Sequence, residues 1–196
     1  MDVMQNLRRG PVYVARRIGY KLYERRHPDE PWLAQGAVHF LDRALPRDGS
    51  GLEWGSGRST AWFSQRLARL TSIEMDAGWY ATVKAQVNGN VDLRHVPIEH
   101  GRDEETPDFP EPTPRYVAVV DAWEDASLDF VLVDGHYRLA CVRAALPKLK
   151  PGGLLAIDNT NWLPDLANWG VPASWPLVHQ SENVMTQTSV WRKVMP

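Results

Sequence analysis

The sequence has few of the features that mark a disulfide-stapled, membrane-spanning or strongly charged protein. Its one cysteine, Cys141, excludes an internal disulfide and a metal site built from paired cysteines, and it is typical of the reducing cytoplasm. Apolar runs such as 130–133 are far shorter than the roughly 20 residues of a membrane-spanning helix or the apolar core of a signal peptide. Lysine and arginine number 22 against 24 acidic residues. We therefore expect a cytoplasmic protein whose partners do not include nucleic acid.

The first 30 residues are rich in basic side chains, and they are predicted to form a helical segment ahead of one domain over residues 31–196. Within this segment Val12, Ile18 and Leu22 lie at spacings that place them on one face of a helix. This apolar face has two interpretations. Either it packs on the domain, or the helix lies on an anionic membrane surface or against a protein partner.

Beyond residue 30 the pattern alternates strands and helices. Five strands are expected, at 51–54, 70–75, 91–96, 128–134 and 153–158. Helices are expected at about 31–45, 59–68, 76–88, 114–120 and 136–146, with a long loop over 97–114. Two more strands, at 175–179 and 188–194, have no helix between them. The predicted fold is α/β, a doubly wound, mainly parallel sheet that ends in an antiparallel hairpin and is preceded by N-terminal helices.

The strongest local signal is a glycine turn between the first strand and its helix. Gly55 and Gly57 can adopt positive φ and let a ligand approach the backbone, and the helix N-terminus beyond them offers unpaired N–H groups. Glu74 follows at the end of the next strand. In a doubly wound sheet that carboxylate reaches the same crevice and can accept both hydroxyls of a ribose. Together these features predict a nucleoside ligand.

Two residues of the turn indicate which nucleoside is bound. Thr60 stands where the dinucleotide fingerprint has its third glycine, which argues against a nicotinamide-dependent oxidoreductase. Glu53 precedes the first glycine and would lie unfavourably beside a pyrophosphate. A carboxylate there suits a cationic ligand with an ammonium group, and so points to S-adenosylmethionine (SAM).

Residues 53–57, followed by Glu74, resemble the first two motifs of class I SAM-dependent methyltransferases. Residues 129–135 resemble the fourth strand of that family, and 149–157 resemble the turn into its fifth. More narrowly, the chain is similar to a group of small, largely uncharacterised bacterial members. The resemblance implies a Rossmann-like methyltransferase fold and SAM as the cofactor.

The resemblance also implies roles for individual residues around the methionine part of SAM. Gly55, Ser56 and Gly57 would line this part of the cofactor. Glu53 would hold its amino group, directly or through water.

For the adenosine part, the resemblance places Glu74 on the ribose and Met75 along the adenine. Ile98 or Glu99, just past the third strand, would close the adenine pocket.

The reaction end of the site is predicted at the carboxyl ends of the fourth and fifth strands. Asp134 and His136 are the candidate catalytic residues there, with His136 as a possible general base because an unperturbed imidazole titrates near neutral pH. Asp134, Asp158 and Asn159 also match the ligand types of catechol O-methyltransferase-like enzymes and would suit Mg²⁺. In the alternative interpretation Asp134 belongs to the SAM pocket, and the pair Asp158 and Asn159 only caps a turn.

The function expected from these observations is SAM-dependent methyl transfer to a small-molecule or glycan-like acceptor, with oxygen as one candidate accepting atom. Two alternatives stay open. One is a protein that binds SAM or another nucleoside without catalysis, and the less favoured one is a nicotinamide-dependent oxidoreductase.

Overall fold

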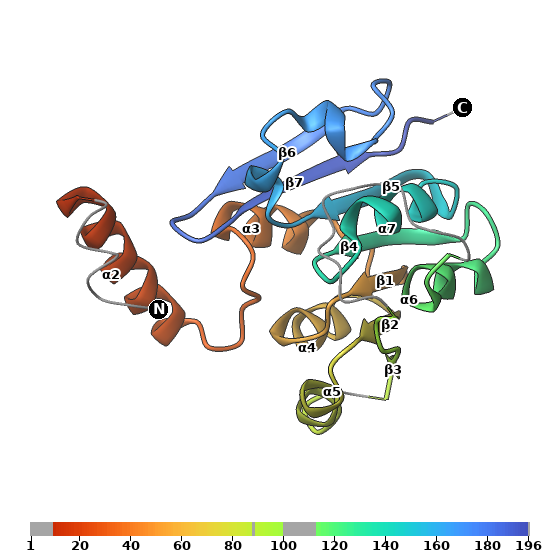
Figure 1. Ribbon diagram of the computed structural model, residues 1–196, viewed down its shortest axis with the longest axis horizontal. Helices are drawn as coiled ribbons and strands as arrows, with labels where there is room; N and C mark the ends of the chain where they lie inside the picture. The colour runs from red at the N-terminus through yellow and green to blue at the C-terminus, as the bar shows by residue number, and fades with distance from the viewer. Residues whose placement is uncertain (1–9, 88, 100–112, 196) are drawn as a thin grey trace.

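Seven strands form one sheet in the computed structural model, which describes residues 10–87, 89–99 and 113–195 (Figure 1). The strands are β1 (Ser50–Trp54), β2 (Arg69–Glu74), β3 (Val91–His95), β4 (Leu128–Val133), β5 (Leu149–Ile157), β6 (Leu177–Glu182) and β7 (Gln187–Arg192). They lie in the order β3-β2-β1-β4-β5-β7-β6. Neighbours among β1 to β5 run parallel, whereas β7 runs antiparallel to both β5 and β6. The predicted doubly wound α/β sheet with a closing antiparallel hairpin is confirmed.

Helices cover both faces of the sheet. The α-helices are α2 (Pro11–Arg26), α3 (Gln35–Ala44), α4 (Arg58–Ser64), α5 (Ala77–Lys84), α6 (Arg115–Ala118) and α7 (Arg138–Ala145), and the 3₁₀ turns are η1 (Val119–Ala122), η2 (Thr160–Trp162) and η3 (Leu166–Trp169). Helices α3 and α4 pack on one face, and α6 and α7 pack on the other. Helix α2 stands apart at one side of the molecule, joined to the sheet layers by the segment that leads into α3 (Figure 1).

Strand β4 shows how the sheet separates two hydrophobic cores. Phe130 and Leu132 belong to the core under α3 and α4, whereas Val131 and Val133 belong to the core under α6 and α7. A continuously apolar strand of this kind is typical of a parallel sheet that is covered on both faces. The chain order reverses between β1 and β4, and in open α/β sheets ligands bind beyond the strand ends at such a switch point.

At this switch point the turn after β1 and the turn after β4 are in direct backbone contact. Gly55 has φ +92°, and a Cβ on it would lie 2.7 Å from the Asp134 carbonyl oxygen. A Cβ on Gly135 would collide with Tyr116 Oη and would lie 2.8 Å from the Gly55 nitrogen. Both positions need glycine, and the positive φ predicted at Gly55 is confirmed. Gly57 does not use the same freedom, because its φ of 169° is extended.

Several helix ends differ from the prediction. The helix expected from residue 31 begins at Gln35, because Ala34 is still extended and caps it. Helix α5 begins as predicted, with Asp76 Oδ1 accepting a hydrogen bond from Trp79 N (2.6 Å), but it ends at Lys84.

The loop predicted over 97–114 lies mostly outside the described residues. The helices in the described part of the chain are each too short or too polar to span a bilayer.

The contact between the two turns predicts that Gly135→Ala is destabilising. The new methyl group meets Tyr116 Oη and the backbone of Gly55, so we expect the free energy of unfolding in urea to fall by about 2–3 kcal/mol. Gly89→Ala is the matched control, since a Cβ there meets nothing within 4 Å. Adding Tyr116→Phe to Gly135→Ala should restore only part of the loss. A Gly135→Ala variant as stable as the original protein would contradict the close approach.

Candidate functional site

The carboxylate of Glu53 lies fully buried at the end of β1, beneath the glycine turn. Its Oε2 accepts hydrogen bonds from Thr60 Oγ1 (2.7 Å) and Ser72 Oγ (2.7 Å). Thr60 Oγ1 also accepts a hydrogen bond from Gly57 N (2.9 Å), so this threonine ties the turn to the carboxylate. The sequence interpretation treated Thr60 only as a missing glycine and overlooked this role.

The second oxygen of Glu53, Oε1, has no well-aligned hydrogen-bond partner among the described residues, while the nearby Ser59 side chain lowers the pKa of this carboxyl. Burial raises the pKa of this carboxyl to about 7. A buried, half-satisfied carboxylate is costly unless a ligand supplies a donor or a positive charge. The site therefore fits an ammonium group, as predicted for the amino group of SAM.

Glu74 bonds the glycine turn to the end of β2. Its Oε2 accepts hydrogen bonds from the backbone N (3.1 Å) and Oγ (2.6 Å) of Ser56, and its Oε1 accepts them from Met75 N (2.8 Å) and Asp76 N (2.9 Å). The structure thus brings Glu74 and the turn together, as the sequence predicted. A carboxylate has about four acceptor positions. A ribose can therefore bind Glu74 only by taking the place of the Ser56 hydroxyl.

Aromatic residues that the sequence interpretation did not place border the same turn. Trp79 Nε1 donates a hydrogen bond to the Ser56 carbonyl oxygen (2.8 Å). Its ring stacks on Trp32 at 6.4 Å between centroids, and the Arg58 guanidinium lies 5.0 Å from the Trp32 ring. Trp79 is the third residue of α5 and follows the predicted cofactor residues closely in the sequence. This position could have identified it as a residue of the turn.

The other predicted adenosine residues lie on the β2 and β3 side of the turn. Met75 follows β2 and is 36% exposed, which leaves its side chain available to a ligand. Ile98 packs against the hydrophobic core under α6 and α7. Glu99 accepts hydrogen bonds from the backbone N (3.0 Å) and Nε (2.5 Å) of Arg115 at the start of α6. Their contact with adenine stays a prediction.

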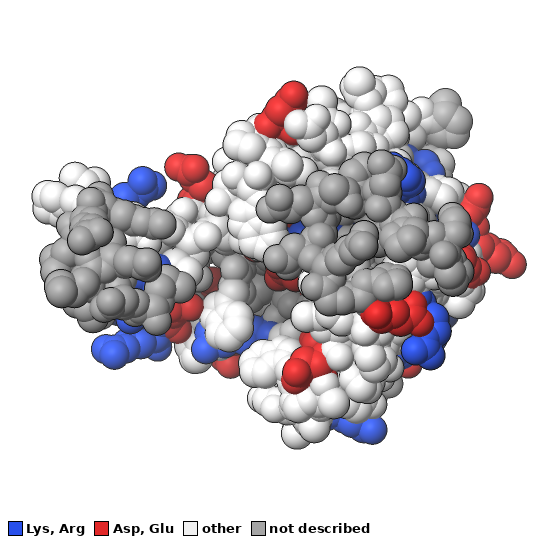
Figure 2. Space-filling view, viewed as in Figure 1, with Lys and Arg blue, Asp and Glu red and all other residues white. Residues whose placement is uncertain are grey.

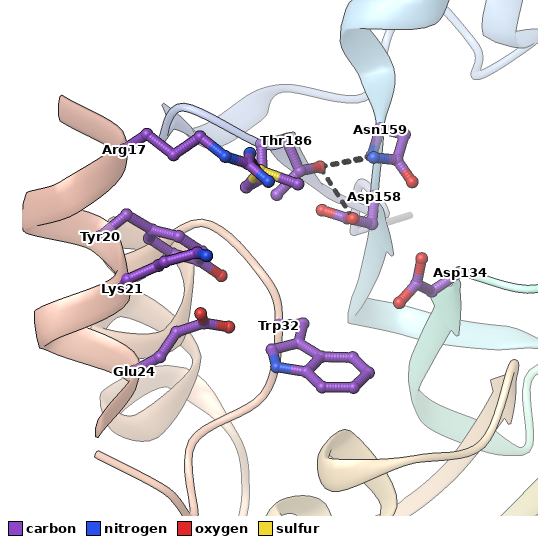
Figure 3. Close-up of a pocket in the computed structure, with 10 residues that line it drawn as sticks. Arg17, Tyr20, Lys21, Glu24, Trp32, Asp134, Asp158, Asn159 and Thr186 are labelled. Atoms are coloured by element: carbon purple, nitrogen blue, oxygen red, sulfur yellow. Dashed lines mark hydrogen bonds between the residues drawn. The ribbon is translucent and has the colours of Figure 1, made fainter. Parts of the chain in front are cut away.

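A cavity of about 360 Å³ lies on the other side of the switch point, between α2 and the carboxyl ends of β4 and β5 (Figure 3). Asp134, Asp158 and Asn159 line it from the strand ends, and Thr186 lines it from the β6–β7 turn. Trp32 presents its ring to the same space. The structure therefore brings together the three residues that the sequence predicted at the reaction end.

Helix α2 supplies the opposite wall of this cavity through Arg17, Tyr20, Lys21 and Glu24 (Figure 3). Arg17 Nη1 donates to the sulfur of Met185 in the β6–β7 turn. Burial and the charge of Glu24 raise the pKa of Tyr20 to about 12, so its hydroxyl stays protonated, and its proton is shared with the Glu24 side chain.

The apolar face of α2 points away from the cavity. Val12, Ile18 and Leu22 are exposed, Val12 at 72%, and α2 buries no residue. The interpretation that this face packs on the domain is wrong, because its apolar side chains are exposed and α2 turns charged side chains such as Lys21 and Glu24 toward the cavity. Basic side chains lie around α2 at the left of the molecule (Figure 2). The contact with an anionic membrane or a protein partner stays a prediction.

The donor set predicted for Mg²⁺ is occupied by protein groups. Arg138 donates to Asp134 Oδ1 (3.1 Å) and to Asn159 Oδ1 (2.7 Å). Asp158 accepts from Thr188 Oγ1 (2.5 Å) and Thr186 Oγ1 (2.8 Å) through its two oxygens. Within residues 10–87, 89–99 and 113–195, no group of three or more His, Cys, Asp and Glu side chains could hold a metal. The Mg²⁺ site is therefore not supported, because a guanidinium and two hydroxyls already use its ligand atoms.

The two candidate catalytic residues differ in their access to the cavity. Asp134 lines it, and burial together with the charge of Asp158 raises the pKa of the Asp134 carboxyl well above its usual range. A raised pKa makes a carboxylate a stronger base, which suits a group that accepts a proton from a substrate. His136 lies at the start of α7, where its ring meets the Tyr137 ring edge to face and its backbone N donates to Tyr116 Oη (3.3 Å).

Comparison with known proteins gives a family and a fold. The model of a family described as "Methyltransferase domain" matches residues 52–160. A search of curated proteins finds no match.

Three solved structures share the fold. A protein from Corynebacterium glutamicum has a TM-score of 0.60 at 15% identity, over 100% of this chain and 99% of that one. An O-methyltransferase from Bacillus cereus, in complex with S-adenosylhomocysteine (SAH), has a TM-score of 0.56 at 14% identity. The match covers 79% of this chain and 78% of that one. A 1,6-didemethyltoxoflavin-N1-methyltransferase from Burkholderia thailandensis, with bound 1,6-didemethyltoxoflavin and SAH, has a TM-score of 0.55 at 16% identity. The match covers 93% of this chain and 89% of that one. At these identities the likeness establishes the fold alone.

The burial of Glu53 predicts a specific dependence of stability on pH. The folded state holds the proton up to a pKa of about 7, whereas the unfolded chain releases it near the usual glutamate pKa of 4.5. Stability is therefore lost as the pH rises from 4.5 to 7, by about 3 kcal/mol, and the loss is complete above that range. Glu53→Gln stays neutral and should not show this loss. Urea unfolding of both proteins at the two ends of the range measures the difference, and an equal response would refute the prediction.

Proposed function

Because the chain belongs to the family of methyltransferase domains, we propose that it transfers a methyl group from SAM to a hydroxyl of a small-molecule or glycan-like acceptor. The observation that carries the proposal is the buried Glu53, whose Oε1 has no partner among the described residues, directly below the glycine turn. The cavity of about 360 Å³ on the other side of the same switch point, lined by both charged and aromatic side chains, provides the space for an acceptor.

The methionine end of SAM would bind at the β1 turn. Glu53 would pair with its ammonium group, and the backbone of Gly55, Ser56 and Gly57 would line it. When bound, SAM supplies an activated methyl group, so the protein's own task is to align the acceptor and to take up its proton. A buried carboxylate that gains an opposite charge is relieved of its desolvation cost, which supports this orientation.

The adenosine end would lie over the end of β2. Glu74 would accept the ribose hydroxyls after the Ser56 hydroxyl has moved aside, while the backbone N–H groups of Met75 and Asp76 keep the carboxylate in place. Met75 would lie along the adenine, and Ile98 or Glu99 would close its pocket.

The acceptor would bind in the cavity between α2 and the strand ends. Asp134 would take the proton of the reacting hydroxyl, because its carboxylate lines the cavity and follows directly on β4. Trp32 offers a flat ring, and Tyr20 and Asn159 offer hydrogen-bonding groups around it. A flat ring among polar groups suits a polyhydroxylated or glycan-like acceptor, whose apolar face stacks while its hydroxyls are hydrogen-bonded.

A SAM-binding protein without catalysis is the second candidate, and the same cofactor contacts support it. Only turnover of an acceptor separates the two. The nicotinamide-dependent oxidoreductase is disfavoured, because Glu53 would face a pyrophosphate at the turn.

Calorimetry with SAH tests the cofactor assignment. We expect one SAH per chain and no heat with NAD. Glu74→Ala should weaken SAH binding roughly tenfold to a hundredfold, because hydrogen bonds to a charged carboxylate contribute about 1.5–3 kcal/mol. Asp92→Ala is the matched control, since Asp92 is an exposed residue of β3 paired with Arg94. Binding of NAD in place of SAH, or an unchanged affinity in Glu74→Ala, would remove this assignment.

The catalytic assignment is tested with an acceptor found by screening hydroxyl compounds. Asp134→Asn should lower kcat by roughly 10²–10⁴, the usual contribution of a general base, with little effect on KM for SAM. His136→Ala should retain most of the activity. The opposite pattern would make His136 the base, and two active variants would leave catalysis to alignment alone.

A further inference from the structure

We propose that Arg138 takes the place of a divalent metal ion in the acceptor site: its guanidinium holds Asp134 and Asn159 in position, and the site is complete without a metal. The inference deepens the proposed function and rests on it, because these residues would face the acceptor.

The Arg138 guanidinium is surrounded by oxygen atoms from both strand ends. Nη2 donates to Asp134 Oδ1 (3.1 Å) and to the Asp134 carbonyl (3.1 Å), and Nε donates to the Gly135 carbonyl (3.0 Å). Nη1 donates to the Asp158 carbonyl (2.5 Å) and to Asn159 Oδ1 (2.7 Å). A guanidinium has five N–H donors, and these five hydrogen bonds use them. The Arg138 side chain is only 8% exposed, and the Trp162 ring lies 4.6 Å from it.

The five oxygen atoms around the Arg138 guanidinium, here called the oxygen cage, are of the kinds that a hard divalent cation binds. Such ions bind carboxylate, amide and backbone carbonyl oxygens, and the cage contains all three kinds. The fixed charge of the guanidinium acts in the same direction as a metal would, because it lowers the pKa of the Asp134 carboxyl against the burial and the Asp158 charge that raise it. A metal could enter only by displacing Arg138 from five hydrogen bonds.

Two residues with a left-handed backbone lie beside Arg138. Tyr137, the residue before it, has φ 51°, and Asn159 has φ 58°. A left-handed backbone is unfavourable for residues other than glycine and persists where the surroundings hold it. Arg138 acts through Asp134 and Asn159, so it is a positioning residue and not a catalytic one.

The arrangement also limits the class of acceptor. A metal ion can bind two neighbouring oxygens of a diolate at once, whereas a guanidinium whose donors are already used cannot. The acceptor should therefore present a single hydroxyl to Asp134, and neighbouring hydroxyl groups should not be required for binding.

Mn²⁺, observed by electron paramagnetic resonance, is the probe for the absence of a metal site. The original protein with saturating SAH should leave the spectrum of free Mn²⁺ unchanged, and chelator should not alter its SAH affinity or Tm. Binding of one Mn²⁺ per chain that is lost in Asp158→Asn would overturn the proposal.

Arg138→Ala tests the cage itself. Removing one partner of a buried charged network should lower Tm by roughly 10 °C, and guanidinium ion at low concentration should restore part of the loss while methylammonium does not. The oxygens that are set free should now bind one Mn²⁺. Arg143→Ala, on the exposed side of the same helix, is the control and should show none of these effects. A folded Arg138→Ala variant that binds no Mn²⁺ and ignores guanidinium would make Arg138 merely structural and overturn the proposal.

Arg138→Lys keeps the test decisive if the alanine variant does not fold. One ammonium group keeps the charge but cannot bridge both strand ends, so this variant should fold with a lower Tm, bind no Mn²⁺ and keep its SAH affinity. An unchanged Tm would count against the proposal. Failure of the original protein to bind SAH would instead refute the proposed function, whatever the result with Mn²⁺.

Discussion

The contact between Gly55 and the Asp134–Gly135 peptide is the constraint on which the rest of the site depends. Strands β1 and β4 stay paired up to Trp54 and Val133, and the missing Cβ atoms let the turns that follow them remain in contact. The Asp134 carbonyl that lies against Gly55 is also an acceptor for Arg138. One peptide group thus connects the glycine turn, where the cofactor would bind, to the cation that organises the acceptor side.

The buried acids of the site differ in how many of their acceptor positions the protein itself fills. Glu74 and Asp158 have both oxygens occupied by donors of the protein, so they hold the turns and the hairpin in place. Glu53 keeps Oε1 without a partner in the described part of the chain, and burial raises its pKa. A fold gains nothing from such an oxygen, which is why a ligand that neutralises it is the simplest explanation for its presence.

Much of this arrangement could be predicted from the sequence, because its signals are local. A strand, a glycine turn and a helix are consecutive in the chain, and Glu74 follows at the end of the very next strand. Arg138 was missed because its five acceptors come from two strand ends and include three backbone carbonyls, which leave no mark in the sequence. The same carboxylate and amide pattern around Asp134 and Asn159 therefore suggested a metal where the fold has placed a guanidinium.

The two sides of the acceptor cavity are held by different forces. The strand ends are fixed by the sheet, by the glycine contact and by the Arg138 network. Helix α2 buries no residue, and the contacts of Arg17 with Met185 and of Arg16 with Glu182 are polar contacts that water can replace. Segments with few buried apolar contacts open at the lowest free energy. The cavity is therefore rigid where the methyl group would be transferred and adaptable where the rest of an acceptor would lie, so differences in acceptor shape would be accommodated by α2 and not by the sheet.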